Sequence, residues 1–173
     1  MNDVIRTLIS RRSAKGYADR QVEEPLLEQI LQAGTYAANG MGAQSPVMVV
    51  LQDPEEIAQL QRMNAAVLGN PERQTFYGAP TVVVVLADKT VKTYLEDGSL
   101  VIGNLMNAAY SLGVDSCWIH RAKEELETPE GRQLLADWGL GENYVGIGHC
   151  ILGYRSGPER EAAPRKAGYV IRR

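Results

Sequence analysis

The run from Thr81 to Leu86 places the tightest constraint on how this chain can fold. After the threonine, every residue in the run is valine or leucine, so as a strand it is apolar on both faces. A strand of this composition is stable only when both of its faces are buried. We therefore predict that Thr81 to Leu86 forms a central strand of a sheet.

Capping residues and apolar periodicity predict further elements on either side of this strand. Helices are expected to begin after Asn2 and near Glu24, Asp53, Leu95 and Thr128, and strands to cover residues 46–51, 114–119 and 145–152. The long helix is predicted to end at Gly113, a residue suited to a left-handed cap. This order predicts one domain over residues 1–173, of the α+β or α/β class, with a mixed sheet.

The segment from Gly153 to the end of the chain has the character of an extended arm. It ends on the apolar residues Tyr169, Val170 and Ile171, which have no partner within their own element. Two interpretations are open: the arm packs on another subunit, or it is a free tail.

Composition excludes several classes of partner. The chain has 18 basic and 21 acidic residues, a net charge of −3, which argues against a nucleic-acid partner. No apolar run approaches the roughly 20 residues that span a bilayer, so no membrane association is expected. The two cysteines, Cys117 and Cys150, lack metal-binding spacing and favour a reducing, cytoplasmic location.

A cationic cluster follows the first predicted helix. Arg11, Arg12, Ser13 and Lys15 combine guanidinium, hydroxyl and ammonium groups that can hold a phosphate. The same cations would also complement the negative end of a helix dipole. A second basic pair, Arg165-Lys166, lies in the arm. Taken alone it fits an ordinary surface charge pair, but a phosphate held from both ends of the chain would explain both clusters.

Two further segments are candidate ligand contacts. Gly40 to Pro46 is rich in glycine, allows close backbone approach, and offers the amide of Gln44, although an ordinary helix-to-strand connection fits as well. His120 ends a predicted strand, where it could donate a proton, bind a metal or contribute only its backbone. With two histidines in the chain a metal site is disfavoured. A Cys117–His120 nucleophile pair is disfavoured too, because residues three apart on a strand point to opposite faces.

Known catalytic motifs are missing from the sequence. It contains no P-loop, nucleophile elbow, zinc-protease helix or Rossmann fingerprint. A phosphate clamp with glycine-lined surfaces and no acid–base triad predicts that a cofactor supplies the chemistry.

Several motifs, in order along nearly the whole chain, together resemble the nitroreductase family. They are Arg11-Arg12-Ser13-x-Lys15, Gly40-Met41-Gly42-x-Gln44-Ser45-Pro46, Phe76-Tyr77-Gly78-Ala79-Pro80, Asp97-Gly98-Ser99 with Asn104 to Ala109, Leu112 to Ile119, and Gly153-Tyr154 with Pro164-Arg165-Lys166. The resemblance implies an α+β fold of three layers, with a mixed sheet flanked by helices. It also implies a homodimer that exchanges its C-terminal arms and holds FMN at the subunit interface.

The resemblance also implies a set of FMN-binding residues. Arg11, Arg12, Ser13 and Lys15 are expected at the phosphate, the ribityl chain and one ring edge, and Arg165 and Lys166 at the same phosphate. Ala38, Asn39, Gly40 and Gln44 are expected to reach the flavin of the partner subunit, and Asn64 the pyrimidine edge. Trp118, Ile119, His120 and Arg121 are expected to pass flavin N5, where the backbone N–H of His120 would donate.

The implied activity is ping-pong transfer of hydride from NADH or NADPH through flavin N5 to a nitroaromatic, quinone or similar acceptor. No side chain is expected to be a catalytic residue, and Lys15 would stabilise the negative charge of reduced flavin. The sequence departs from many members at Ala38-Asn39, Gly42 and Gln44-Ser45-Pro46, and from larger members at His120, which leaves the acceptor open. Two alternatives remain: a flavin-binding redox sensor or carrier without turnover, and a structural or ligand-binding protein without flavin.

Overall fold

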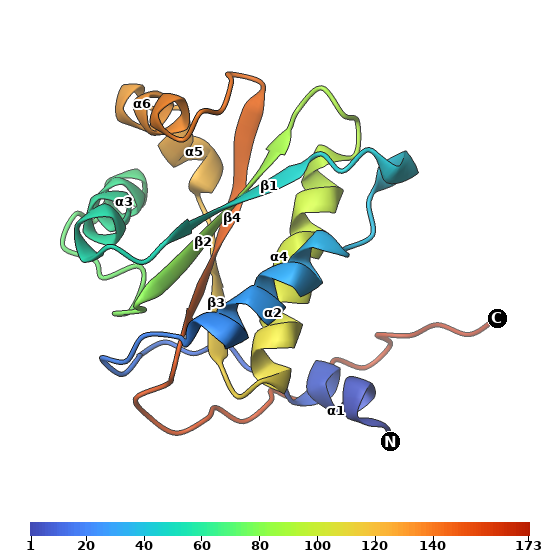
Figure 1. Ribbon diagram of the computed structural model, residues 1–173. Coiled ribbons are helices and arrows are strands. Elements are labelled where there is room, and N and C mark those ends of the chain that lie inside the picture. Colours follow the sequence, from blue (N-terminus) through green and yellow to red (C-terminus); the bar gives the residue numbers. More distant parts are fainter.

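The computed structural model describes residues 1–173 and contains one four-stranded sheet between two layers of helices (Figure 1). The strands are β1 (Pro46–Leu51), β2 (Thr81–Asp88), β3 (Asp115–Ile119) and β4 (Tyr144–Gly153), in the order β1-β2-β4-β3. The three strand pairings are all antiparallel. The α+β class is thus confirmed.

The prediction of a mixed sheet needs correction. Parallel pairing is confined to an isolated bridge between Ser13 and Ser116 at the edge of β3. Apolar patterning reports which residues of a strand are buried, but it carries no information on the direction of the neighbouring strand.

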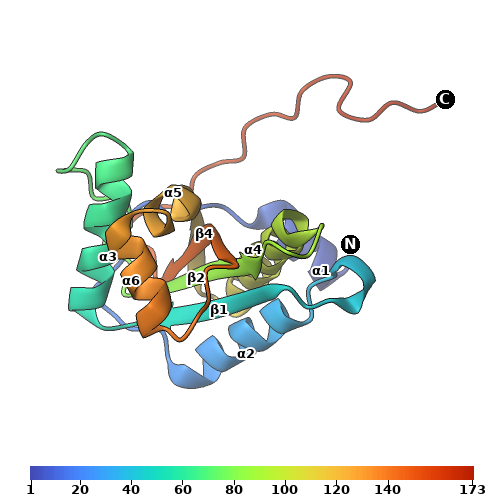
Figure 2. The same ribbon diagram turned by 90° about the horizontal axis from the view of Figure 1, so that it is seen from above.

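Helices cover both faces of the sheet, as Figure 2 shows from above. The helices are α1 (Asp3–Ser10), α2 (Glu24–Thr35), α3 (Pro54–Val67), α4 (Tyr94–Ser111), α5 (Ala122–Leu126) and α6 (Pro129–Asp137), with a short 3₁₀ turn, η1, at Gly40–Gly42. The pair α2 and α4 lies on one face, and α3, α5 and α6 lie on the other. None of these helices combines the length and the apolar character needed to cross a membrane.

Strand β2 is central, as its sequence predicts. Its residues alternate between the two cores and are fully buried from Thr81 to Ala87. One core, shared with α3 and α6, receives Val82, Val84 and Leu86. The other core, shared with α2 and α4, receives Val83, Val85 and Ala87.

Helices α1 and α3 begin at the capping residues that the sequence predicts, and α4 ends just before the predicted glycine. Asn2 Oδ1 accepts a hydrogen bond from the Ile5 N–H at 3.0 Å, and Asp53 caps α3 through the N–H groups of its first turn. Gly113 adopts a φ of 76°, the left-handed conformation expected after a helix. Helix α5 was not predicted, because five residues are too few to display a helical period.

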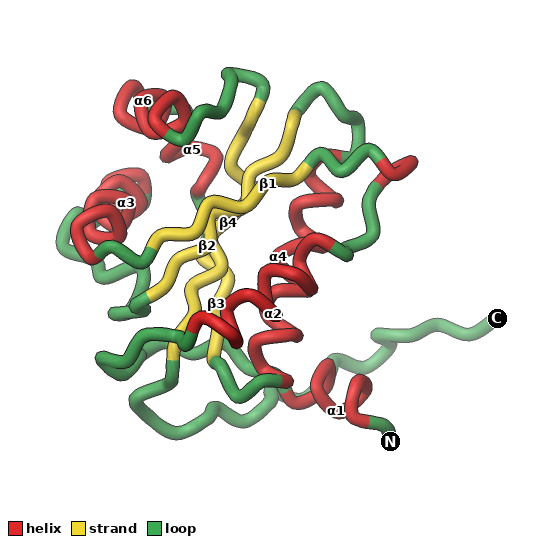
Figure 3. The backbone as a smooth tube through the Cα atoms, in the orientation of Figure 1, coloured by secondary structure: helices red, strands yellow, loops and turns green.

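The segment after α1 runs past the start of β3 and the chain that leaves β4, which lie at one end of the sheet, and it brings distant parts of the chain together. The Ala14 N–H donates to the Ser116 carbonyl at 3.0 Å, and the Ser156 N–H donates to the Gly16 carbonyl at 3.1 Å. Beyond this point the C-terminal arm leaves the body as an extended loop, drawn in green in Figure 3.

Candidate functional site

A pocket opens where β3 ends, and three separate segments form it. We call it the β3-end pocket. Lys15 comes from the segment after α1, four residues come from the connection between α3 and β2, and the rest come from β3 and the turn that follows. The lining residues are Lys15, Leu68, Arg73, Thr75, Tyr77, Cys117, Trp118, Ile119, His120 and Arg121, around a volume of about 290 Å³.

Positive charge dominates the β3-end pocket. Lys15, Arg73 and Arg121 line it, and no carboxylate does. The Lys15 ammonium lies 5.9 Å from the centre of the Tyr77 ring. Nearby, Nη1 of Arg11 is buried without a hydrogen-bond partner. A buried donor without a partner is costly, so this arrangement suits an anionic ligand.

Cys117 lines the same pocket but is not primed as a nucleophile. Burial raises the pKa of its thiol, against the smaller, opposite effects of a hydrogen bond with Ser13 and the charges of Lys15 and Arg11. A thiol with a raised pKa carries little thiolate at neutral pH. The pocket therefore has no evident nucleophile of its own.

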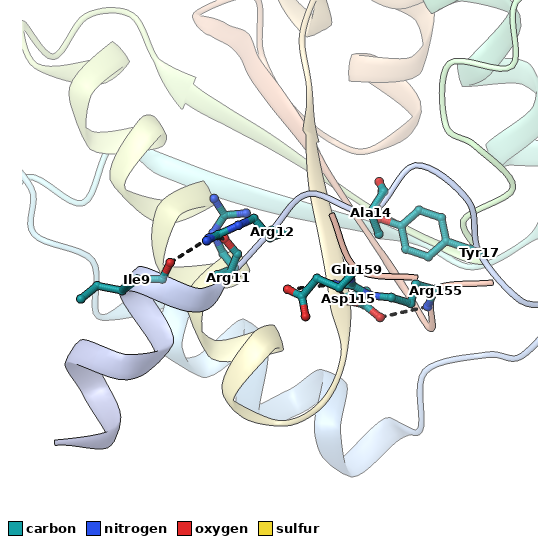
Figure 4. A network of polar contacts seen from close by, with 8 residues as sticks. All are labelled: Ile9, Arg11, Arg12, Ala14, Tyr17, Asp115, Arg155 and Glu159. Atoms are coloured by element: carbon teal, nitrogen blue, oxygen red, sulfur yellow. Dashed lines mark hydrogen bonds and ion pairs between the residues drawn. The ribbon is translucent and has the colours of Figure 1, made fainter. Parts of the chain in front are cut away.

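The two arginines after α1 have different roles. Nη1 of Arg12 donates to the carbonyls of Ile9 and Arg11 at 2.7 and 2.8 Å (Figure 4). Arg12 thus supplies hydrogen-bond donors to carbonyl groups at the C-terminal end of α1. This is the structural role that the sequence left open as an alternative to phosphate binding. Arg11 keeps an unpaired nitrogen and is the better placed of the two for a ligand.

A second groove lies beside this segment, between residues 13–16 and residues 155–160. Arg155 belongs to it, but Asp115 occupies its guanidinium, with Nε 2.6 Å from Oδ1, and Glu159 lies 3.7 Å away (Figure 4). The hydrogen bond that Arg155 donates to Asp115 raises the pKa of Arg155. Arg155 is therefore a structural tie between β3 and the chain that leaves β4.

The arm residues are not brought to Arg11 within one chain. The Arg165 guanidinium donates to the carbonyl of Ala163 in the arm, at 2.6 Å from Nη2, and Lys166 lies over the Tyr169 ring at 5.4 Å. The arm itself extends away from the body (Figure 2). A phosphate held from both ends of the chain would thus require the arm of a partner subunit, or a movement of the arm.

The glycine-rich segment lies elsewhere in the chain. Asn39 and Gln44 line a separate pocket with Asp97, and none of its lining residues belongs to the β3-end pocket. Ala38 and Gly40 precede and begin the exposed turn η1. Within one chain, the pocket lined by Asn39 and Gln44 is therefore separate from the β3-end pocket.

Asn64 lies beneath the β3-end pocket and does not line it. Its side chain has no exposed surface. Its Nδ2 donates to the His120 carbonyl at 2.8 Å, and its Oδ1 accepts from Arg121 Nη2 at 2.8 Å. Direct contact with the pyrimidine edge of a flavin would therefore require Asn64 to give up these partners.

Sequence reasoning missed several residues that shape the site. They are Arg73, Thr75 and Tyr77 in the pocket wall, Asp97 under η1, and Glu125 with His149 below the turn after β3. Tyr77 and Asp97 each lie within a motif that the sequence had singled out, without a role assigned to them. Nothing in the spacing of the others connects them to Lys15 or to His120.

Comparison with known proteins decides the family, since the profile of the nitroreductase family matches residues 8–154. The chain belongs to the nitroreductase family. A relative in Archaeoglobus fulgidus, provisionally named an NADH dehydrogenase/NAD(P)H nitroreductase, is 30% identical over 159 residues, which cover 89% of this chain and 86% of the relative.

Crystal structures of other nitroreductases share the fold. A nitroreductase with bound FMN from Bacteroides fragilis superimposes with a TM-score of 0.90 at 29% identity, over 99% of this chain and 98% of the other. A nitroreductase with bound FMN from Desulfitobacterium hafniense gives a TM-score of 0.89 at 22% identity, over the whole of both chains.

Proposed function

We propose that this nitroreductase-family protein is an FMN-dependent oxidoreductase of one domain, with NADH or NADPH as electron donor. The observation that carries the proposal is the β3-end pocket, in which Lys15, Arg73 and Arg121 converge without a carboxylate. The bound FMN of the Bacteroides fragilis relative supports the choice of cofactor. When bound, FMN would accept hydride from NAD(P)H and pass it to a nitroaromatic, quinone or similar acceptor in a ping-pong reaction.

The chain's own residues would bind and orient the cofactor. Arg11, with its unpaired buried nitrogen, and Ser13 would hold the phosphate. Lys15 would place its ammonium at the N1–C2 carbonyl edge, where reduced flavin carries negative charge. The residues from Trp118 to Arg121 would run along the ring, with the backbone N–H of His120 as donor to N5.

We further propose that the functional unit is a homodimer that completes each site with Ala38, Asn39, Gly40, Gln44, Arg165 and Lys166 of the partner subunit. Support comes from α1, which has no buried residue although Val4, Ile5, Leu8 and Ile9 form an apolar stripe. Leu8 and Ile9 are 52% and 56% exposed. Helix α1 touches α4 but leaves this apolar stripe exposed within its own chain, and an exposed apolar stripe of this kind favours a partner outside the chain.

The dimer is tested by sedimentation equilibrium of the FMN-loaded protein. We expect a mass of twice the 19.0 kDa of one chain. Replacing Leu8 with lysine should shift the protein toward monomer, whereas Arg6→Ala, on the polar side of the same helix, should not. A folded, flavin-loaded wild-type monomer would exclude the dimer.

The activity is tested by the visible absorption spectrum of the purified protein, before and after anaerobic NADPH or NADH. We expect an oxidised flavin spectrum that bleaches with the donor and returns on addition of a quinone. Protein that remains colourless and takes up no added FMN would refute the proposal. Bleaching without steady-state turnover would instead identify a flavin-binding redox carrier.

A further inference from the structure

Three polar side chains with no exposed surface lie directly beneath the turn that follows β3. They are Asn64 on α3, Glu125 on α5 and His149 on β4. Asn64 Nδ2 donates to Oε1 of Glu125, and Oε2 of Glu125 lies 3.1 Å from Nε2 of His149. The three side chains therefore form one contiguous network across three elements, in which a hydrogen bond joins Asn64 to Glu125 and a close contact, not a hydrogen bond of standard geometry, joins Glu125 to His149.

The network contacts the backbone of this turn at two consecutive carbonyls. Asn64 Nδ2 donates to the His120 carbonyl at 2.8 Å. His149 Nδ1 lies 3.4 Å from the Ile119 carbonyl. Fixing two successive carbonyls also fixes the peptide planes on either side of His120, and with them the direction of its backbone N–H.

Arg121 supplies a third point of attachment. Its φ is 81°, a left-handed conformation that is unfavourable for a residue with a side chain. Its Nε and Nη2 both donate to Oδ1 of Asn64, at 3.3 and 2.8 Å. Asn64 thus holds both the backbone before Arg121 and the guanidinium that lines the β3-end pocket.

Burial argues that this network has a positioning role. A buried carboxylate is costly to desolvate even when it is paired, and apolar side chains of the same size would fill the space without that cost. Here the carboxylate of Glu125 accepts a hydrogen bond from Asn64, and Asn64 binds the turn that follows β3. This turn forms one wall of the β3-end pocket.

We propose that Asn64, Glu125 and His149 are positioning residues that hold the Ile119–Arg121 turn in the conformation FMN requires, without contacting FMN themselves. The proposal rests on the proposed function. In this proposal Asn64 acts on FMN indirectly, through the turn, and does not contact the pyrimidine edge. The positively charged group that lines the pocket at this turn is the guanidinium of Arg121.

The test compares wild type with Asn64→Ala, Glu125→Ala and Glu125→Gln. Leu135→Ala serves as the stability control, because Leu135 on α6 is buried in the core on the same side of the sheet. The first readout needs no flavin: the 15N order parameters of the His120 and Arg121 backbone amides in the apoprotein, from NMR relaxation. The second is the dissociation constant of oxidised FMN, and the third is kcat and KM for the donor.

In Asn64→Ala and Glu125→Ala we expect the order parameters of the His120 and Arg121 amides to fall, because the turn loses its support. We expect FMN binding to weaken about tenfold, as for loss of a buried hydrogen bond to a charged group. Glu125→Gln keeps a side chain that can accept from Asn64 and donate to His149, so it should restore both properties. Donor kcat should fall more than KM changes, because the turn orients the flavin rather than the donor.

The outcomes separate this proposal from the proposed function. If wild type binds FMN and turns over but Asn64→Ala matches it in amide order parameters and FMN affinity, the positioning role is overturned. The same follows if Leu135→Ala loses FMN affinity as strongly, since general stability would then explain the effect. If wild type takes up no FMN, the proposed function fails first and this proposal fails with it.

Discussion

The backbone N–H of Gly40 donates to Oδ1 of Asp97 at 2.9 Å, joining η1 to the first turn of α4 across more than fifty residues of sequence. Oδ2 of the same carboxylate accepts from Ser45 Oγ at 2.9 Å and from Thr93 Oγ1 at 3.1 Å. Asp97 is almost fully buried. One carboxylate thus holds the glycine-rich segment that we assign to the site of the partner subunit.

Asp97→Ala should therefore destabilise the protein and loosen this segment. Loss of a buried carboxylate with several donors is expected to lower the free energy of unfolding by about 3 kcal/mol. Urea denaturation measures this change, and flavin titration should show weaker binding. Asp53→Ala, at the exposed cap of α3, should cost only about 1 kcal/mol and leave FMN affinity unchanged. Equal effects of the two variants would contradict the proposed role of Asp97.

Lys15→Ala should weaken FMN binding about tenfold or more, because a hydrogen bond to a charged group contributes roughly 1.5–3 kcal/mol. The flavin midpoint potential should also fall, since the ammonium favours the reduced, anionic form. Fluorescence titration and spectroelectrochemistry measure the two effects. Lys15→Arg should retain most of both, and Lys123→Ala, on the exposed surface of α5, should change neither. Unaltered affinity and potential in Lys15→Ala would remove Lys15 from the site.

The cysteines report on the location of the flavin without any measurement of activity. Cys117 lines the β3-end pocket, whereas Cys150 has no exposed surface. Burial raises the pKa of both thiols. For Cys117, a hydrogen bond with Ser13 and the charges of Lys15 and Arg11 oppose this rise. We expect slow alkylation of Cys117 in the apoprotein, slower alkylation with FMN bound, and no reaction of Cys150 before unfolding. Mass spectrometry after iodoacetamide treatment measures each rate, and Cys117 labelling that ignores saturating FMN would place the flavin elsewhere.

Glu23 should make stability depend on pH in the acid range. A hydrogen bond from the Tyr154 hydroxyl, and then one from Arg20, lower the pKa of Glu23 from 4.5 to about 2. Because the folded-state pKa is below the unfolded value, the stabilisation is complete above pH 4.5 and is lost as the pH falls toward 2. Wild type should lose more stability over this interval than Glu23→Gln. Glu24→Gln, which removes a charge from the neighbouring position, is the matched control. Parallel pH profiles for wild type and Glu23→Gln would exclude the effect.

The sequence predicted the local structure well where the signal is local. Asn2 and Asp53 cap their helices through side-chain oxygens within three residues. The valines of β2 require a strand buried on both faces in any arrangement. These features depend on neighbours in sequence and on periodicity, both of which can be read directly from the chain.

Only the tertiary structure decided which segments meet, because apolar periodicity marks a buried face and does not name the face packed against it. It made the sheet antiparallel, and it bound Arg12 to the end of α1 while leaving a buried nitrogen of Arg11 unpaired. It brought Arg73 to the pocket that Arg121 lines. It also placed Asn64 beneath the pocket, because a side chain on α3 finds its partners on α5 and in the turn after β3, about sixty residues away.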